Sequence, residues 1–327
     1  MAKISIIIPA YNAAQDIGNA LDSVLKNKSD MDIVVIDDAS SDDTCSVVEQ
    51  YMSRHSNIRL LRNEANTGPG VARNRALMSI DSEYCMFHDA DDTLVNGAVD
   101  ILTSLMDRAD VDFAFFNYFI LRNRGAVLEE GGIGAEGTWQ DALGGQELAI
   151  VELDKAPNLL LMVNYPWNKI FRTSFIRRVN LRFSTARINE DILPHWVAFM
   201  HAGRFLAVNR KLTIHSLIAG SDQHTNVYDE RRLAIFEAIR ETESIFERNK
   251  VFRDKYYHLF LYFKAGLLGW ALSRVRPDLR RIFDEHVTHS YRGFTDEDFK
   301  RIYQHSPDLA LTILKLKYSP AGLATAA

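Results

Sequence analysis

The fold of this chain is indicated first by a single stretch, Glu83-Tyr84-Cys85-Met86-Phe87-His88-Asp89-Ala90-Asp91-Asp92. Residues 83–87 are typical of a short buried strand, because aromatic and sulphur side chains suit the interior of a sheet. The three aspartates that follow repel one another, and each raises the pKa of the others. A hard divalent cation with oxygen ligands would relieve that repulsion. The alternative is an aspartate-rich turn that caps a helix starting near Leu94, since aspartate favours turns and N-caps.

Strands and helices alternate four times in the first part of the chain. Continuous apolar runs predict buried parallel strands at residues 4–8, 32–36, 58–61 and 83–87. Helical spacing predicts helices at residues 17–25, after the polar turn 37–44, and at 71–78. This alternation is the pattern of an α/β open sheet with right-handed crossovers. Ligands bind at the carboxyl ends of such strands, so we expect a site lined by Pro9–Asn12, Asp37-Asp38 and Asp89–Asp92.

The remainder of the chain predicts elements of both kinds. Residues 112–120 are rich in aromatic and apolar side chains and predict another strand, whereas the glycine-rich segment 125–145 predicts a long loop or hairpin near the site. Residues 189–191 lead into an apolar helix at about 192–200. From residue 228 onward, amphipathic helices at Ile235–Phe246 and Leu259–Leu272 predict an α-helical appendage.

Composition and charge exclude several classes of protein. The chain has 327 residues, of which 47% are hydrophobic and 25% charged, and its formal net charge is −5. A chain with this net charge has no overall positive electrostatic potential, so we expect no nucleic-acid partner. Cys45 and Cys85 are the only cysteines, which favours a reducing compartment over a disulfide framework. No uncharged apolar stretch reaches the roughly 18 residues that span a bilayer, so we expect a cytoplasmic protein, soluble or at most peripheral to a membrane.

Six segments resemble the motifs of one family and occur in its order. They are Ser5–Asn12, Val35–Thr44, Asn66–Asn74, Asp89–Asp92, Trp167–Phe171 and Asn189–Asp191. Together they are similar to the inverting glycosyltransferases of family 2, which have the GT-A fold. Ala39 departs from the pattern, because the family usually has glycine there. The resemblance implies a Rossmann-like, mostly parallel central sheet, with a catalytic domain at residues 1–227 and a helical C-terminal region at 228–327.

The resemblance also implies a site for a nucleotide-sugar donor, with a UDP-sugar expected. The residues implied on this side are Pro9, Tyr11, Asn12, Asp38, Gly68, Arg73 and Asp89. Asp38 would accept the imide N–H of uracil, unless it only stabilises a turn or caps a helix. Tyr11 would pack against the base, and the glycines of residues 68–70 would permit a close backbone approach. Arg73 would contact the base or a phosphate, with an exposed helix arginine as the alternative.

Glycosyl transfer requires that the charge of the leaving diphosphate be neutralised. Mg²⁺ or Mn²⁺ held by Asp89, Asp91 or both would bridge the phosphates and act as a Lewis acid. Asp92 would complete the shell of the ion or cap the next helix. His224 lies where some relatives place a late metal or phosphate ligand, although a lone histidine in a polar loop is more often only solvated.

The acceptor hydroxyl requires a base on the opposite side of the sugar from the leaving group. The resemblance makes Asp191 that base and Glu190 a lesser candidate, and one carboxylate in line with C1 gives inversion. The alternative for Asp191 is an N-cap of the following helix. Trp167, Asn168 and Lys169 are expected to shape the acceptor side, although Trp167 would serve equally well in the core.

These predictions describe a metal-dependent hexosyl- or N-acetylhexosaminyl-transferase that extends a cell-surface polysaccharide or lipid-linked glycan on the cytoplasmic face. One rival is a sugar nucleotidyltransferase, whose glycine-rich, lysine-bearing phosphate loop is missing from residues 9–16. The other is a non-catalytic carbohydrate-binding protein, against which the joint presence of Asp38, Asp91 and Asp191 speaks. The aromatic stripe Tyr256–Trp270 is expected to pack internally, with a homodimer interface or a peripheral membrane contact as alternatives.

Overall fold

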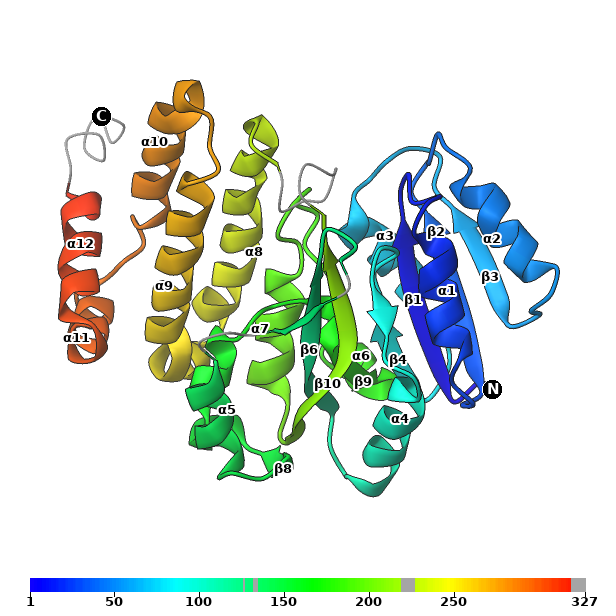
Figure 1. The fold of residues 1–327 in the computed structure, drawn as a ribbon. Coiled ribbons are helices and arrows are strands. Elements are labelled where there is room, and N and C mark those ends of the chain that lie inside the picture. Colours follow the sequence, from blue (N-terminus) through cyan, green and yellow to red (C-terminus); the bar gives the residue numbers. More distant parts are fainter. Residues whose placement is uncertain (126, 132–134, 219–226, 319–327) are drawn as a thin grey trace. The chain divides into compact units, whose positions relative to one another are not determined.

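The computed structural model describes residues 1–125, 127–131, 135–218 and 227–318 (Figure 1). The chain divides into two compact units. The first consists of Met1–Thr185 and Glu190–Ala219, and the second of Ala186–Asn189 and Gly220–Ala327. The assignment of a catalytic domain to residues 1–227 and of a separate helical region to 228–327 stays a prediction.

The first unit begins with a parallel sheet whose strands alternate with helices. The strands are β1 (Ile4–Ala10), β2 (Met31–Asp37), β3 (Ile58–Arg62) and β4 (Tyr84–Phe87), in the order β3-β2-β1-β4. The helices between them are α1 (Ile17–Leu25), α2 (Thr44–Met52) and α3 (Pro69–Leu77). Every residue of β1 is buried, as expected of a parallel strand covered on both faces. The predicted alternation of strand and helix is confirmed.

The same sheet continues with the later strands of the first unit. These are β5 (Thr93–Leu94), β6 (Phe113–Arg122), β7 (Leu128–Glu130), β8 (Leu148–Val151), β9 (Lys169–Arg172) and β10 (Phe205–Leu217). Strand β9 is antiparallel to both β4 and β6, whereas β6 and β10 run parallel to each other. One antiparallel strand therefore joins the two parallel parts of the predicted α/β sheet.

The helices of this part of the unit pack around the sheet. They are α4 (Ala98–Arg108), α5 (Glu136–Leu143), α6 (Thr173–Arg178) and α7 (Ile192–His201), with short 3₁₀ helices at Leu153–Lys155, Pro157–Leu161 and Pro166–Asn168. Nearly every residue of α7 is buried, which agrees with the apolar helix predicted after residue 191.

The segment after the acidic stretch differs from the prediction. Leu94 lies in strand β5, antiparallel to β10, and α4 begins only at Ala98. Gly97 precedes α4 in a left-handed conformation, with φ +76°, which glycine adopts without steric cost. The helix was predicted too early because the polar turn continues past a two-residue strand that is too short to give a pattern of its own.

The described residues of the segment 125–145 include a strand and a helix. Strand β7 forms the predicted hairpin with β6, but helix α5 was not predicted. The buried Trp139 of α5 stacks on Phe115 with ring centroids 5.1 Å apart. Trp139 and Leu143, one turn apart, are the buried residues of α5, so two apolar side chains anchor a short helix of mostly small and polar residues.

The second unit is helical, as predicted. Its helices are α8 (Ile235–Arg248), α9 (Lys250–Leu272), α10 (Arg280–Ser290), α11 (Asp296–His305) and α12 (Pro307–Lys317), with 3₁₀ helices at Glu230–Ala234 and Pro277–Leu279. Tyr256, Tyr257 and Phe260 of the aromatic stripe are buried, whereas Tyr262 is exposed. Most of that stripe thus packs inside the unit.

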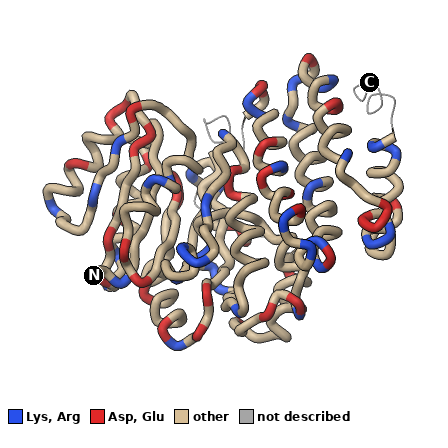
Figure 2. Tube along the Cα trace, turned by 180° about the vertical axis from the view of Figure 1, so that it is seen from behind, with Lys and Arg blue, Asp and Glu red and all other residues tan. Residues whose placement is uncertain are grey.

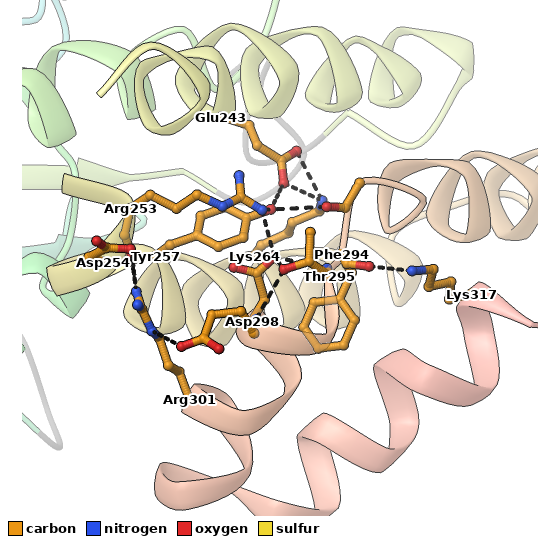
Figure 3. A network of polar contacts seen from close by, with 12 residues as sticks. Glu243, Arg253, Asp254, Tyr257, Lys264, Phe294, Thr295, Asp298, Arg301 and Lys317 are labelled. Atoms are coloured by element: carbon orange, nitrogen blue, oxygen red, sulfur yellow. Dashed lines mark hydrogen bonds and ion pairs between the residues drawn. The ribbon is translucent and has the colours of Figure 1, made fainter. Parts of the chain in front are cut away.

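A polar network joins α8, α9, α10 and α11 (Figure 3). The ammonium group of Lys264, which is fully buried, lies 3.2 Å from Glu243 and donates to the carbonyl oxygen of Ser290 at 2.5 Å. Arg253 lies 2.6 Å from Asp298, which forms a capping box with Thr295 at the start of α11. Each buried charge of the network therefore has an opposite partner.

Lysine and arginine residues are interspersed with acidic residues along the helices (Figure 2). Arg281 and Glu285, for example, are one turn apart on α10 and lie 3.5 Å apart. Within the described ranges, every helix is too short or too polar to cross a membrane.

Candidate active site

Three strands of the parallel sheet end at one edge and bring the predicted polar segments together. The register pairs Ala10 of β1 with Asp37 of β2, and Ile7 of β1 with Phe87 of β4. Because these neighbouring strands run parallel, the residues that follow each of them emerge at the same edge. The segments after β1, β2 and β4 therefore form one polar edge, which we call the acidic edge (residues 9–12, 37–41 and 88–92).

Short loops at this edge are fastened to one another. The backbone N–H of Asn12 donates to Ser40 Oγ at 2.9 Å, and Asn12 Oδ1 accepts from the backbone N–H of Ser41 at 2.9 Å. Asn12 and Ala39 both have left-handed backbones, with φ +48° and +63°. Pro9 is the buried penultimate residue of β1, and Tyr11 is 52% exposed beside these loops. An aromatic face is thus available where the nucleotide base is predicted.

Asp38 is buried and fastens the loop that leads into α3. Its carboxylate accepts from Asn63 Nδ2 at 2.6 Å, from Thr67 Oγ1 at 2.8 Å and from the backbone N–H of Gly68 at 2.7 Å. These bonds match the alternative of a loop-stabilising aspartate. Its contact with a uracil ring stays a prediction.

The first turns of α3 are clamped to the segment that precedes Asp191. A Cβ at Gly70 would lie 2.5 Å from the carbonyl oxygen of Ser184 and 2.8 Å from Glu190 Cγ, so only glycine fits. Asn74 Nδ2 donates to the carbonyl oxygen of Phe183 at 3.0 Å, and Asn74 Oδ1 accepts the N–H of Phe183 at 2.8 Å. Gly70 does permit a close backbone approach, and the segment that approaches belongs to the chain itself.

Arg73 lies at the centre of the site. It is 3% exposed, so the alternative of an exposed helix arginine is wrong. Its Nη1 lies 2.7 Å from Glu190 Oε1 and its Nη2 lies 2.6 Å from Asp89 Oδ1, while the guanidinium covers the ring of Phe183. Burial acts to lower the pKa of Arg73, but the two carboxylates outweigh it and the pKa is raised. One guanidinium therefore joins the predicted ion site to the predicted base segment.

The acidic triplet has the composition of a site for a hard cation. One carboxylate oxygen from each of Asp89, Asp91 and Asp92 lies within 4.8 Å of the others. Asp92 is fully buried, however, and accepts from His215 Nδ1 at 3.0 Å and from the backbone N–H of Ser216 at 2.8 Å.

The surroundings of Asp92 rule out the alternative of a helix cap, because it is followed by strand β5 and bonded to β10. Burial raises the pKa of Asp92 to about 7 although His215 opposes this. Asp89 and Asp91, which are partly exposed, remain the candidates for an ion. His224 lies outside the described residues.

The predicted base occupies the start of α7. Asp191 is the N-cap residue, but its side chain makes no capping hydrogen bond, so the capping alternative does not account for its carboxylate. Burial, with a smaller contribution from Glu190, raises the pKa of Asp191 to about 8, while Arg73 and Lys169 act in the opposite direction. A carboxyl group with such a pKa is a stronger base than an ordinary aspartate.

Trp167, Asn168 and Lys169, predicted on the acceptor side, are all buried. Lys169 Nζ donates to the carbonyl oxygen of Tyr165 and to Asn168 Oδ1, both at 2.7 Å, and burial lowers its pKa to about 7. The Trp167 ring stacks on Tyr165 at 4.7 Å, which matches the alternative of a core tryptophan. These residues support the site from beneath.

Sequence reasoning missed Tyr165 and gave His215 only a weak chance of being a ligand. Tyr165 is partly exposed and stacks on Trp167, and the Asp89, Asp92 and Asp191 carboxylates add to burial in raising its pKa. His215 packs against the rings of both Tyr165 and Trp167 and holds Asp92. The position of Tyr165 beside the Trp167 motif was an available signal, whereas nothing in the sequence links His215 to a residue 123 positions earlier.

Comparison with protein families gives an independent result. The sequence model of glycosyl transferase family 2 matches residues 5–178, a little over half of the chain. The match contains the segments at the acidic edge, the α3 segment and the Trp167 segment, and it ends before Glu190 and Asp191.

Several curated proteins are similar in sequence. "Uncharacterized glycosyltransferase YibD" of Escherichia coli K12 is 27% identical over 200 residues, which cover 58% of this chain and 54% of YibD. The cholesterol galactosyltransferase of Borreliella burgdorferi is 24% identical over 284 residues, covering 83% of this chain and 78% of that protein. The glucosyltransferase WfgD of Escherichia coli is 35% identical over 125 residues, covering 38% of this chain and 49% of WfgD. The chain thus spans about half the length of YibD and of WfgD.

Solved structures share the fold. The crystal structure of Staphylococcus aureus TarS 1–349 in complex with UDP-GlcNAc superimposes with a TM-score of 0.79 and 19% identity, covering 96% of this chain and 87% of TarS 1–349. At that identity the likeness concerns the GT-A fold alone. The extent of the family match, together with the motifs that it contains, shows that the chain belongs to glycosyl transferase family 2.

Proposed function

We propose that this chain transfers a sugar from a nucleotide-sugar donor, UDP-linked, to a hydroxyl of a glycan or lipid-linked acceptor, with inversion and with the help of a divalent cation. The activities of two relatives support this class of reaction, since WfgD is a UDP-Glc glucosyltransferase acting on a diphosphoundecaprenol-linked sugar and TarS is a poly(ribitol-phosphate) β-N-acetylglucosaminyltransferase. TarS was also crystallised with UDP-GlcNAc and with UDP.

The observation that carries the proposal is the position of Arg73. Its guanidinium contacts Asp89 of the acidic triplet on one side and Glu190, the neighbour of Asp191, on the other. A reaction of this class requires a group that binds the diphosphate and a group that accepts a proton within one sugar's length of each other. The contacts of Arg73 fit both requirements at once.

Within this proposal Asp191 takes the proton of the acceptor hydroxyl on a carboxylate oxygen. Its raised pKa suits that task, because a base is most effective when its pKa lies near the working pH. Glu190, held by Arg73, supports Asp191 and is not itself available as the base. The donor base is assigned to the exposed ring of Tyr11, on the turn of Pro9 and Asn12.

The residues of the acidic triplet suit Mn²⁺ or Mg²⁺, and Asp89 and Asp91 would hold the ion. Bound there, it would act as a Lewis acid that stabilises the negative charge of the leaving diphosphate. Asp92 orients this part of the edge by its bonds to His215 and Ser216.

The helical region at residues 228–327 is assigned a packing role, and the reaction is placed on the cytoplasmic face of the membrane. A peripheral membrane contact remains the alternative for the exposed part of the aromatic stripe. Flotation of the protein with anionic liposomes distinguishes the two, because packing alone predicts no bound protein.

A thermal-shift experiment tests the proposal. We expect UDP with Mn²⁺ to raise the melting temperature by a few degrees, more than either alone, since a ligand that binds only the folded state stabilises it. Asp91→Ala should lose the Mn²⁺-dependent part of the shift. Asp110→Ala, which removes a carboxylate that is 98% exposed, is the matched control and should keep it. The absence of a shift with every nucleoside diphosphate would refute the proposal.

A further inference from the structure

The guanidinium of Arg73 links two carboxylates that the proposed reaction uses in different ways. It lies 2.6 Å from Asp89, on the side of the donor, and 2.7 Å from Glu190, on the side of the acceptor. Both contacts use different nitrogens of one planar, rigid fork, so the positions of the two carboxylates depend on each other. Because the side chains of Arg73 and Glu190 are buried, water screens their contact little, whereas the Asp89 side chain is 27% exposed and open to a cation from solvent.

The backbone around Arg73 is fixed as firmly as its side chain. Gly70 packs against Ser184 and Glu190 at a distance that leaves no room for a Cβ, and Asn74 makes two hydrogen bonds with Phe183. The first turns of α3 therefore contact Phe183, Ser184 and Glu190, the last of which precedes Asp191 directly. A helix that served only the donor would not need these contacts.

We propose that Arg73 is a positioning residue, which holds Glu190 and thereby Asp191 in place and at the same time competes with the divalent cation for Asp89. The inference rests on the proposed function and deepens it. Its consequence is a coupling between the two halves of the site. A cation that binds Asp89 releases the guanidinium toward Glu190, and by linkage a change at Glu190 alters the affinity for the cation.

The proposal predicts two effects of opposite sign for Arg73→Gln. The acidic triplet loses its resident positive charge, so the affinity for Mn²⁺ should increase about fivefold or more. The base segment loses its anchor, so the rate of UDP release from a UDP-sugar should fall about 100-fold. A merely structural role predicts weaker Mn²⁺ binding together with the lower rate, because an unfolded site binds nothing.

The first experiment measures free Mn²⁺ by electron paramagnetic resonance in titrations of the full chain, and UDP release from the UDP-sugar that gives the largest thermal shift. Arg59→Gln is the matched control. Arg59 makes a two-point ion pair with Asp32, at 2.8 and 2.7 Å, on the strands β3 and β2. That variant loses the same charge and a similar pair, and both measurements should stay at the wild-type values.

A second variant keeps the proposal open to refutation should Arg73→Gln fail to fold. Glu190→Gln leaves the guanidinium to Asp89 alone, so Mn²⁺ should bind about fivefold more weakly. In Arg73→Gln/Glu190→Gln that weakening should largely disappear, because the connection between the two carboxylates is gone.

Several outcomes would overturn the inference. These are unchanged Mn²⁺ affinity or weaker Mn²⁺ binding in folded Arg73→Gln, wild-type affinity in Glu190→Gln, and additive effects in the double variant. The failure of the proposed function looks different, because the wild-type protein would then neither bind Mn²⁺ nor release UDP from any UDP-sugar.

Discussion

The acidic edge of the first unit and the polar network of the second treat buried charge in different ways. In the network, Lys264 lies 3.2 Å from Glu243 and Arg253 lies 2.6 Å from Asp298, while Arg301 pairs with the exposed Asp254 at 2.9 Å (Figure 3). At the edge and beside it, five carboxylates lie around Arg73, Lys169 and His215. These carboxylates are Asp89, Asp91, Asp92, Glu190 and Asp191.

The difference is visible in the pKa values. Burial raises the pKa of Asp191 to about 8 and that of Asp92 to about 7, so their ionised forms are disfavoured. The Asp298 carboxylate helps to raise the pKa of Arg253, although burial opposes this. The network thus favours the charge of Arg253 but disfavours that of Lys264, whose pKa burial lowers although Glu243 opposes this, whereas the edge disfavours the ionised forms of two carboxylates. Carboxylates that are unfavourable for stability are expected at positions where the function of the protein requires them.

Among the variants that test this contrast, Asp191→Asn is expected to have the largest effect. Removing the base should lower the transfer rate about 10²- to 10⁴-fold, while the melting temperature rises by a few degrees because a disfavoured charge disappears. Single-turnover transfer and differential scanning fluorimetry measure the two effects. A variant that loses activity and stability together would show that Asp191 is part of the support of the fold, as the network residues are.

The converse test is Lys264→Met in the network. Because one partner of a buried ion pair is left alone, the free energy of unfolding should fall by about 3–5 kcal/mol, as measured by urea denaturation. The transfer rate per folded molecule should stay within about twofold of the wild-type rate. Lys300→Met removes an exposed lysine of α11 and serves as the control, with a change within about 0.5 kcal/mol. If Lys264→Met lost catalysis without losing stability, the network would not differ from the acidic edge in the way proposed.

Much of the first unit was predictable because its signals are local. The apolar runs of β1 and β2 and the helix after Asp191 each show in a few consecutive residues. The family resemblance likewise identified the acidic triplet and the α3 segment. Helix α5 was missed because it is short and only two of its residues, Trp139 and Leu143, are buried.

The partners of the site residues were not predictable in the same way. Asp92 was left between an ion and a helix cap, but it binds His215 on β10. Arg73 was interpreted as a contact for the donor, yet its visible partners are Asp89 and Glu190. Which side chains meet depends on the register of β10 and on the packing of α3, and a sequence pattern contains neither.

The pH dependence of the reaction sharpens the comparison further. If Asp191 is the base, kcat/KM should rise about tenfold per pH unit and level off near pH 8, because the carboxylate must lose its proton to act. The residual rate of Asp191→Asn should lack this limb. A rate that is independent of pH between 5 and 8 would contradict the assignment.

Stability should follow pH in the opposite direction. The pKa of Asp191 is higher in the folded protein than its ordinary value of 3.8, so the folded state holds the proton more tightly. That contribution to stability is fully present below about pH 4 and is lost as the pH rises through 8. Denaturation of the wild-type protein and of Asp191→Asn at pH 5 and pH 8 measures this effect. The free energy of unfolding of the variant should exceed that of the wild type by more at pH 8 than at pH 5.

The smallest expected effect concerns backbone strain. Ala39 at the acidic edge has φ +63°, whereas none of the described residues from 227 to 318 is a non-glycine residue with positive φ. A left-handed backbone costs a residue with a Cβ about 1–2 kcal/mol, and glycine gives back about 0.5–1 kcal/mol through the entropy of the unfolded chain. Ala39→Gly should thus stabilise the protein by about 0.5–1 kcal/mol in urea denaturation.

The matched change in the helical unit should have the opposite sign. Ala265 lies inside α9, where glycine is less favourable than alanine by about 1 kcal/mol, so Ala265→Gly should destabilise the protein by that amount. If both substitutions destabilise, the left-handed conformation of Ala39 is relieved by contacts that its methyl group makes. Opposite signs would instead show that the acidic edge keeps backbone strain at Ala39, whereas the interior of helix α9 has none at Ala265.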